Sequence, residues 1–471
     1  RAAGGGSLPP RGTFEDIRVT GRKRSRRRHH TSYGWQTVFS AVLLMTELRA
    51  RWFSAAALLS GAWLMAEFAQ LDKPANVVPF LLAAVLMSLG FLLALRLPGI
   101  SLEWFWAIAL GTRLCMVWAS PGTDIYRYIW EGMLQNHGFS PYCVAPSAPA
   151  LMALRNELWP LIKFPDVTAM YPPLAELGFR VLAASSVSVM LFKAAFLAAD
   201  VLICAWMARR FGFHKAIVYA WNPLVIYSFA GGGHYDSWFV FALVGAWLLW
   251  ETAEPSSNSR WGSITLLGVG MALKWVCFPM LGWLLWRIFR RDGWRKAALA
   301  SATALLPLAA SWTIVAHGNW SCSLYPAGFS ADARSAELLP AVIGPFLSTG
   351  HAEKHNEIYL VLFLLFSLFI VLRGRSFAGT LQSVLIVALI TTPMFHAWYT
   401  TWLIPLAVST RSRSVLAFSI SSFTYFWLHY TAGQPGGIWK QSALEKALLW
   451  APLLAGLLWD IRNRGPERSE V

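Results

Sequence analysis

Apolar runs long enough to cross a lipid bilayer recur along this chain from Phe53 to its C-terminus. A spanning helix needs about 17–25 predominantly apolar residues, and its backbone must satisfy its own hydrogen bonds inside the hydrocarbon. The 471 residues are 56% hydrophobic and 14% charged, whereas soluble domains carry about a quarter charged residues. We therefore predict an all-α polytopic membrane protein.

Basic residues gather between the apolar runs and at the N-terminus, and the net charge is +16. This distribution is typical of cytoplasmic loops, and no nucleic-acid-binding module accompanies it, so we expect no nucleic-acid partner. Residues 1–51 are predicted to form a disordered basic cytoplasmic tail; alternatively, translation begins at Met45. Residues 52–464 form the predicted transmembrane domain, and residues 465–471 a short cytoplasmic tail.

The positive-inside rule gives the predicted orientation. With the basic clusters in the cytoplasm, roughly a dozen or more spans follow, both termini are cytoplasmic, and residues 121–173 form a large outer loop. Residues 174–186 are expected to form a short interfacial helix. The apolar segment 263–286 has cytoplasmic flanks but is too short for two spans. We therefore predict a broken hairpin with Lys274 near its tip.

The five cysteines divide into two groups. Cys115, Cys204 and Cys277 lie in apolar runs, where a cysteine behaves as a small buried hydrophobe. Cys143 and Cys322 lie on the predicted outer segments, where a disulfide and two free thiols are both open. No spacing resembles a metal site, so we predict no bound metal.

The unusual polar side chains fall on the outer face of this topology. They are Asp124, Arg127, Asp166, His234, Asp236, Lys274 and His396. A charge within a membrane costs about 2.5–3.5 kcal/mol on insertion scales and is by default a functional hypothesis. A carboxylate can serve as general base for a sugar hydroxyl, and cationic groups can hold a lipid phosphate that leaves. No nucleotide-binding signature is present in the sequence.

Six of these seven residues, all but Asp166, also have a structural interpretation. Asp124 and Arg127 could form a local ion pair that caps a helix. His234 and Asp236 could close the glycine-rich turn that starts at residue 231. Lys274 could extend its side chain to the interface, and the histidine at 396 could belong to an interfacial aromatic belt.

Six short motifs together resemble the GT-C superfamily of glycosyltransferases, which use polyprenyl-phosphate sugars. The resemblance is closest to the bacterial α-mannosyltransferase-like branch. The motifs occupy residues 124–132 (Asp-Ile-Tyr-Arg-Tyr-Ile-Trp-Glu-Gly), 138–142 (Gly-Phe-Ser-Pro-Tyr), 171–175 (Tyr-Pro-Pro-Leu-Ala), 234–236 (His-Tyr-Asp), 272–274 (Ala-Leu-Lys) and 396–399 (His-Ala-Trp-Tyr). The match runs from about Pro121 to Val408.

The resemblance implies a GT-C helical bundle whose first outer loop contains short interfacial helices. It also implies an inverting transfer from a polyprenyl-phosphate-linked sugar, with mannose expected, to a glycan or glycolipid acceptor outside the cytoplasm. Asp124 would be the catalytic base. The residues expected to bind the carrier phosphate are Lys274, His396 and Arg127, and those expected to bind sugar or acceptor are Asp166, His234, Asp236, Tyr126 and Tyr171.

Three departures from the family pattern leave specificity open. Thr123 stands where many relatives have a second acid, so no metal-bridging acid pair and no cofactor are implied, although a divalent cation is not excluded. Tyr235 replaces a usual Asn, and Ala397 replaces a usual Pro. The sugar, the acceptor and the linkage are therefore not fixed by the sequence.

Two other classes of function are weighed against the transferase. A secondary transporter or lipid flippase would show internal repeats with paired interrupted helices, and the sequence contains no convincing repeat. A non-catalytic membrane scaffold would tolerate substitution of Asp124 and Lys274. Within the transferase class, a lipid-A-modifying aminosugar transferase and a protein O-mannosyltransferase remain open.

Overall fold

The computed structural model describes residues 32–251, 257–316, 322, 333–347 and 356–463. Regular structure in these residues is helical, apart from one isolated bridge between Ser335 and Met394. The α-helices are α1 (Ser32–Glu67), α2 (Pro74–Ala94), α3 (Leu102–Val117), α4 (Asp124–Asn136), α5 (Pro173–Ser185), α6 (Val189–Phe211), α7 (Phe213–Ala220), α8 (Pro223–Ile226), α9 (Asp236–Trp250), α10 (Ser257–Leu273), α11 (Phe278–Asp292), α12 (Trp294–Val315), α14 (Leu339–Leu347), α15 (Glu357–Arg373), α16 (Phe377–Thr391), α17 (Ile404–Thr410), α18 (Arg413–Ser421), α19 (Trp427–Ala432) and α20 (Ala443–Arg462). Short 3-10 or π segments are η1 (Pro149–Leu154), η2 (Trp159–Leu161), η3 (Tyr227–Gly231), η4 (Trp275–Cys277), η6 (Ala397–Trp402) and η7 (Ser422–Phe426).

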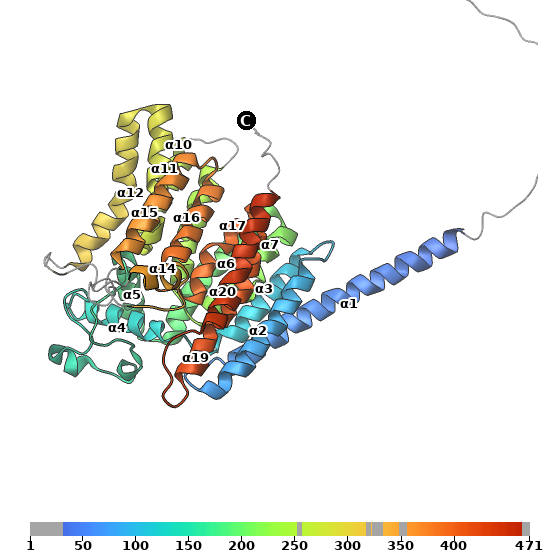
Figure 1. Ribbon diagram of the computed structural model, residues 1–471, viewed down its shortest axis with the longest axis horizontal. Helices are drawn as coiled ribbons and strands as arrows, with labels where there is room; N and C mark the ends of the chain where they lie inside the picture. Colours follow the sequence, from blue (N-terminus) through green and yellow to red (C-terminus); the bar gives the residue numbers. More distant parts are fainter. Residues whose placement is uncertain (1–31, 252–256, 317–321, 323–332, 348–355, 464–471) are drawn as a thin grey trace, which may run out of the picture. The chain divides into compact units, whose positions relative to one another are not determined.

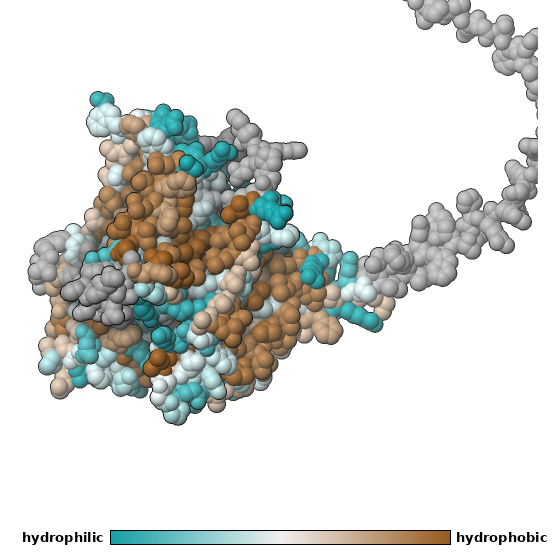
Figure 2. Space-filling view, in the orientation of Figure 1, coloured by the Kyte–Doolittle hydropathy of each residue, from teal (hydrophilic) through white to brown (hydrophobic). Residues whose placement is uncertain are grey.

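The all-α prediction is confirmed for the described residues, and part of the membrane prediction is supported. In the part of the chain that the structure describes, three helices are long and apolar enough to cross a membrane, namely α2, α6 and α12, while α9 and α16 are shorter apolar helices. Figure 2 shows a broad hydrophobic surface over α15 and α16, and Leu360, Leu364 and Phe369 of α15 are each at least half exposed. A surface of this kind fits contact with lipid. The number of spans remains a prediction.

The N-terminal segment differs from its prediction. α1 begins at Ser32, so residues 32–51 of the predicted tail are helical rather than disordered. Residues 1–31 lie outside the described part of the chain. The chain divides into two units, residues 1–49 and residues 50–471.

The predicted break at Lys274 is confirmed. α10 ends at Leu273, Lys274 is extended with φ −158° and ψ 127°, and α11 starts at Phe278. Pro279 explains the break, because a proline inside a continuous helix would lose a backbone hydrogen bond and clash with the preceding turn. At the first turn of α11, the same proline is tolerated.

The predicted outer loop contains the expected short helices, and α5 agrees with the interfacial helix predicted at 174–186. α4 packs directly on α5 at Gly132, where an added Cβ would lie 2.3 Å from the carbonyl oxygen of Phe179. Only glycine permits this approach. In Figure 1, α4 and α5 lie beside one another at the same end of the helical bundle.

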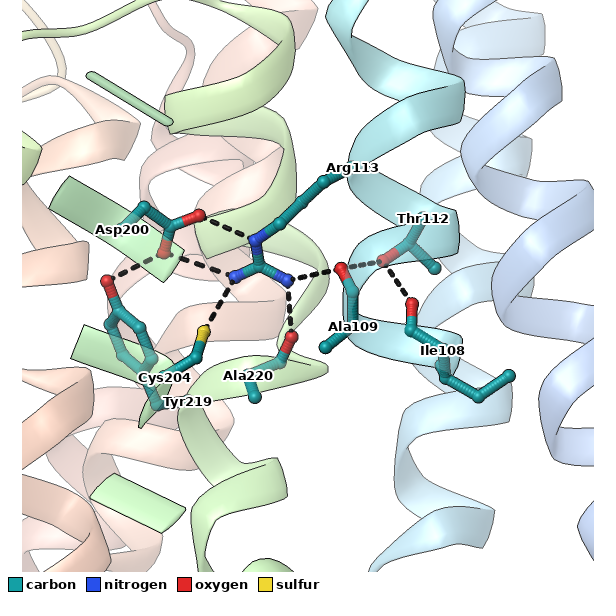
Figure 3. A network of polar contacts seen from close by, with 8 residues as sticks. All are labelled: Ile108, Ala109, Thr112, Arg113, Asp200, Cys204, Tyr219 and Ala220. Atoms are coloured by element: carbon teal, nitrogen blue, oxygen red, sulfur yellow. Dashed lines mark hydrogen bonds and ion pairs between the residues drawn. The ribbon is translucent and has the colours of Figure 1, made fainter. Parts of the chain in front are cut away.

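Helices α3 and α6 are joined by a buried ion pair that the sequence analysis did not predict. Arg113 donates to Asp200 at 2.6 Å from Nε and at 3.1 Å from Nη2, and both side chains are at most 1% exposed. Carbonyl oxygens of Ala109 and Ala220 and the hydroxyl of Tyr219 complete the network (Figure 3). A buried charge pair is tolerated when its remaining polar groups are hydrogen-bonded in this way.

Candidate functional site

Asp124 is the first residue of α4, and its carboxyl faces His234. The Oδ2 atom lies 3.7 Å from Nδ1 of His234. Protein surrounds the carboxyl, yet 34% of the side chain's surface reaches solvent. Burial raises the pKa of Asp124 to about 6, and the charge of Asp236 adds to this rise, while Lys274 and Arg127 oppose it. A carboxyl that ionises near neutral pH and is open to solvent suits a general base.

A close contact between two loops brings Asp124 and His234 together. The amide of Gly122 donates to the carbonyl of Gly232 at 2.8 Å. An added Cβ on Gly122 would lie 3.3 Å from both that carbonyl oxygen and Nε2 of His234. Gly233 has φ +70°, a conformation that favours glycine, and it turns the chain between η3 and α9.

Trp398 lies between two histidines. Its ring stacks on His234 with centroids 3.8 Å apart and on His396 with centroids 4.5 Å apart. Burial, together with the positive charge of Lys274, lowers the pKa of each histidine to about 3. Both imidazoles are therefore neutral at pH 7. His396 can hold a phosphate as a hydrogen-bond donor, not as the cation that the sequence analysis assumed.

His396 is oriented by Tyr425. The Nδ1 atom of His396 lies 2.6 Å from the hydroxyl of Tyr425, in a contact whose donor depends on the tautomer. By contrast, Nδ1 of His234 is buried without a hydrogen-bond partner in the described part of the chain. The two imidazoles therefore differ in their fixed contacts, although they share the same tryptophan.

Lys274 lies at the break between α10 and α11 and pairs with Asp236. Its Nζ atom is 2.5 Å from Oδ1 of Asp236, which also accepts a hydrogen bond from Nε1 of Trp402 at 2.8 Å. The rings of Tyr235, Tyr399 and Trp402 surround the ammonium, with centroids 4.7–5.0 Å away. Lys274 remains 16% exposed, whereas the carboxyl of Asp236 is 1% exposed. The cation is thus held in place and still reaches solvent.

Arg127 has a structural role in this arrangement. Nε donates to Glu131 at 2.7 Å, and the four remaining N–H groups are hydrogen-bonded to carbonyl oxygens of residues 163, 164, 167 and 168. An arginine has five N–H donors, so none is left for a carrier phosphate. These contacts favour a structural role over phosphate binding, although the ion-pair partner of Arg127 is Glu131 and not Asp124, as the structural interpretation of the sequence had it.

The other predicted residues differ in their placement. Tyr171 packs against Tyr128 and Tyr235, with ring centroids 5.0 and 5.4 Å apart. Burial and the charge of Asp124 raise the pKa of Tyr171, so Tyr171 borders the site. Tyr126 is half-buried, and its pKa is raised by this burial and by the charge of Asp72 rather than by a site residue. Asp166 is exposed, and within the described residues it makes no hydrogen bond or ion pair with the site.

Two buried glutamates next to Arg127 were missed by the sequence analysis. Glu131 lies on α4 and Glu176 on α5, and both are at most 1% exposed. Burial and the neighbouring charge of Glu131 raise the pKa of Glu176 well above its usual range. Glu131 lies within the 124–132 motif, which was the available signal. Trp402 gave none, because isolated tryptophans are common in this chain.

An apolar cavity of about 480 Å³ lies along the C-terminal part of α10. It lies between α5, α9 and α10, and its lining includes Leu177, Gly178, Trp238, Phe241, Leu266 and Leu273. Leu273, at the end of this lining, directly precedes Lys274 in the sequence.

Comparisons with known proteins give no relative. A scan against protein-family models, a search of curated proteins and a search of solved structures each find no match. In the described part of the chain, no group of three or more His, Cys, Asp or Glu side chains is arranged to hold a metal ion.

Proposed function

We propose that this protein is an inverting membrane glycosyltransferase of the GT-C type. It would move a sugar, with mannose expected, from a polyprenyl phosphate to a glycan or glycolipid acceptor on the extracytoplasmic side. The observation that carries the proposal is the convergence of polar residues from four separate segments of the chain. These residues are Asp124, His234, Asp236, Lys274 and His396.

The proposed step is a single displacement. The acceptor hydroxyl attacks the anomeric carbon, and the bond from that carbon to the phosphate oxygen breaks. Asp124 takes the hydroxyl proton, while polyprenyl phosphate leaves with the bonding electrons. Lys274 would stabilise the negative charge on this leaving group, because Asp236 occupies only one of its three N–H donors.

Two further features support the proposal. The apolar cavity whose lining includes Leu273, the residue before Lys274, is suited to the first isoprene units of a lipid carrier. Cys143 and Cys322 form a disulfide, and such bonds persist in oxidising compartments outside the cytoplasm. The pairing resolves the alternative that the sequence left open, and it agrees with an extracytoplasmic assignment for the residues around Cys143.

A transport function is the second candidate, and the buried pair Arg113–Asp200 is the feature that would favour it. Intramembrane charges often mark a transport pathway. Here both side chains are at most 1% exposed and are hydrogen-bonded on all sides, so we assign them to helix packing. Uptake of a labelled lipid or sugar into proteoliposomes without a covalent product would favour transport.

The test uses membranes that contain the full chain, a radiolabelled polyprenyl-phosphate sugar and extracted envelope glycolipids as acceptors. Asp124→Asn should reduce transfer by at least about a hundredfold, the usual contribution of a general base. Asp72→Asn is the matched control, because Asp72 is an exposed aspartate that, among the described residues, no hydrogen bond or ion pair connects to Asp124. Near-normal transfer by Asp124→Asn, at equal expression, would rule out the proposed base.

A further inference from the structure

A basic surface forms where two distant helix connections meet. Arg287 on α11 donates from Nη2 to the carbonyls of Gly374 and Arg375 at 2.9 and 2.7 Å, and Nε1 of Trp283 also donates to Gly374 at 3.0 Å. These bonds fix the α11–α12 connection against the α15–α16 connection. We define the basic surface by the six arginines that the two connections bring together: Arg287, Arg290, Arg291, Arg295, Arg373 and Arg375.

Three arginines of this surface lie over aromatic rings that reach the outside of the bundle. Arg290 lies over Trp286 at 5.7 Å and Arg295 over Trp294 at 5.7 Å, measured to the ring centroids. Trp286 is 42% exposed and Trp294 is 66% exposed. On α15, the guanidinium of Arg373 lies 4.2 Å from the ring centroid of Phe369.

These arginine–aromatic pairs indicate where the basic surface lies along the membrane normal. Exposed tryptophans of membrane proteins lie at the boundary between hydrocarbon and headgroups. Trp294 is the first residue of α12, one of the helices apolar enough to cross a membrane, and Arg295 follows it. Guanidinium groups stacked on such rings therefore lie at the level of the lipid phosphates. Figure 2 shows hydrophilic residues at the end where α11 and α12 meet in Figure 1.

Acidic side chains do not neutralise this surface. Asp292 lies within it but pairs with Arg260 at 3.9 Å and Lys296 at 3.6 Å. Within the described residues, none of the six arginines forms an ion pair with an acid, and all six are exposed. The arginines therefore carry a dense positive charge at the level where anionic headgroups lie.

We propose that the basic surface binds anionic phospholipid headgroups in the leaflet at this end of the protein. Guanidinium groups bind phosphate through paired hydrogen bonds, and their positions on aromatic rings reduce the loss of side-chain freedom on binding. This lipid site is separate from the candidate catalytic residues, and it does not depend on the transferase proposal. A phosphodiester with a net negative charge, such as that of phosphatidylglycerol, is the expected ligand.

The test compares lipids bound to the full-length protein in detergent. Native mass spectrometry would count phosphatidylglycerol and phosphatidylcholine molecules retained at equal lipid concentrations. The triple variant Arg290→Gln, Arg291→Gln, Arg295→Gln keeps the hydrogen bonds of Trp283 and Arg287, so the two connections stay together. Its affinity for phosphatidylglycerol should fall on the order of a hundredfold, given the usual contribution of a basic residue near anionic lipid.

A matched control removes the same charge elsewhere. Lys163→Gln, Arg180→Gln, Lys440→Gln changes three residues outside the basic surface and should bind phosphatidylglycerol as the wild type does. Wild-type binding should also weaken as salt is raised. Equal retention of the two lipids, or equal loss in both triple variants, would overturn the proposal. Retention of duplex DNA or RNA that phosphatidylglycerol fails to displace would overturn it as well.

Discussion

Asp124 and His234 are far apart in the sequence, yet their side chains approach to 3.7 Å because Gly122 and Gly232 allow two backbone segments to touch. The carboxyl belongs to the start of α4, and the imidazole belongs to the turn before α9. Neither group would face the other without this contact. The predictions below concern the chemistry and the geometry that follow from it.

The pH dependence of transfer should report the ionisation of Asp124. Burial and the neighbouring charge of Asp236 raise its pKa to about 6. Only the ionised carboxyl can accept a proton, so kcat/KM should fall about tenfold per pH unit below this pKa. A pH–rate profile with the purified protein would check this. A profile that is flat through this range would contradict the role of Asp124 as base.

Asp124→Asn should abolish transfer without lowering thermal stability. The pKa of Asp124 in the folded protein lies above its usual value of 3.8, so the folded state binds this proton more tightly than the unfolded chain does. Stability is therefore highest below that value and falls as the pH rises toward about 6. An uncharged amide removes this penalty, so the Tm at pH 7 should be no lower than that of the wild type. A clear drop in Tm would instead indicate a helix-capping role.

Gly122→Ala should lower transfer by about tenfold to a hundredfold, because small displacements of catalytic groups have effects of this size. The new methyl group would lie 3.3 Å from the carbonyl oxygen of Gly232 and from Nε2 of His234, so the two loops must move apart. Gly99→Ala is the control, since an added Cβ there meets no atom within 4 Å. Steady-state transfer at matched expression would measure the difference. Equal activity of the two variants would show that the close contact is dispensable.

Lys274→Met should destabilise the protein strongly, by about 3–5 kcal/mol, because it leaves a buried carboxylate without its partner. The side chain of Asp236 is 1% exposed and pairs with Lys274 at 2.5 Å. The double variant Lys274→Met, Asp236→Asn should recover most of the Tm without recovering transfer. Thermal unfolding in detergent and the transfer assay would separate the two effects. Transfer by the stable double variant would exclude Lys274 from carrier binding.

Removal of the disulfide should destabilise the segment that it joins. Cys143→Ser is expected to lower the free energy of unfolding by about 2–4 kcal/mol, the usual stabilisation by a disulfide. Cys115→Ser is the control, because Cys115 is a free cysteine. Peptide mass mapping without reductant should find Cys143 linked to Cys322, and Tm measurements should distinguish the variants. Alkylation of both thiols in unreduced protein would contradict the pairing.

Part of the candidate site could be predicted from the sequence because hydropathy and charge determine which segments share a face. The break at Lys274 followed from an apolar segment too short for two spans. Asp124, His234 and His396 were likewise placed at one face by the orientation of the apolar runs. The structure brings their side chains together with Trp398 between the two histidines.

Other contacts could not be predicted, because hydropathy does not determine which helix faces meet. Arg113 and Asp200 lie in separate apolar runs, and only packing of α3 on α6 reveals that they pair. The sequence analysis assigned Arg127 to the carrier phosphate. Its actual partners are carbonyl groups of a loop that is distant in the sequence, and no side-chain pattern marks them. The sequence also contains no sign that Nε1 of Trp402, at the end of η6, donates a hydrogen bond to Asp236.

The bond between Cys143 and Cys322 closes a covalent ring whose ends are 179 residues apart in the sequence. His234 and Lys274 lie within this ring, whereas Asp124 and His396 lie on the two arms outside it. A single protease cut between the cysteines would leave one covalently connected molecule. A cut on either arm, between the ring and its site residue, would release a fragment that carries Asp124 or His396. The candidate site is therefore assembled from the disulfide-closed ring and from the two chain segments that extend from it toward the N- and C-termini.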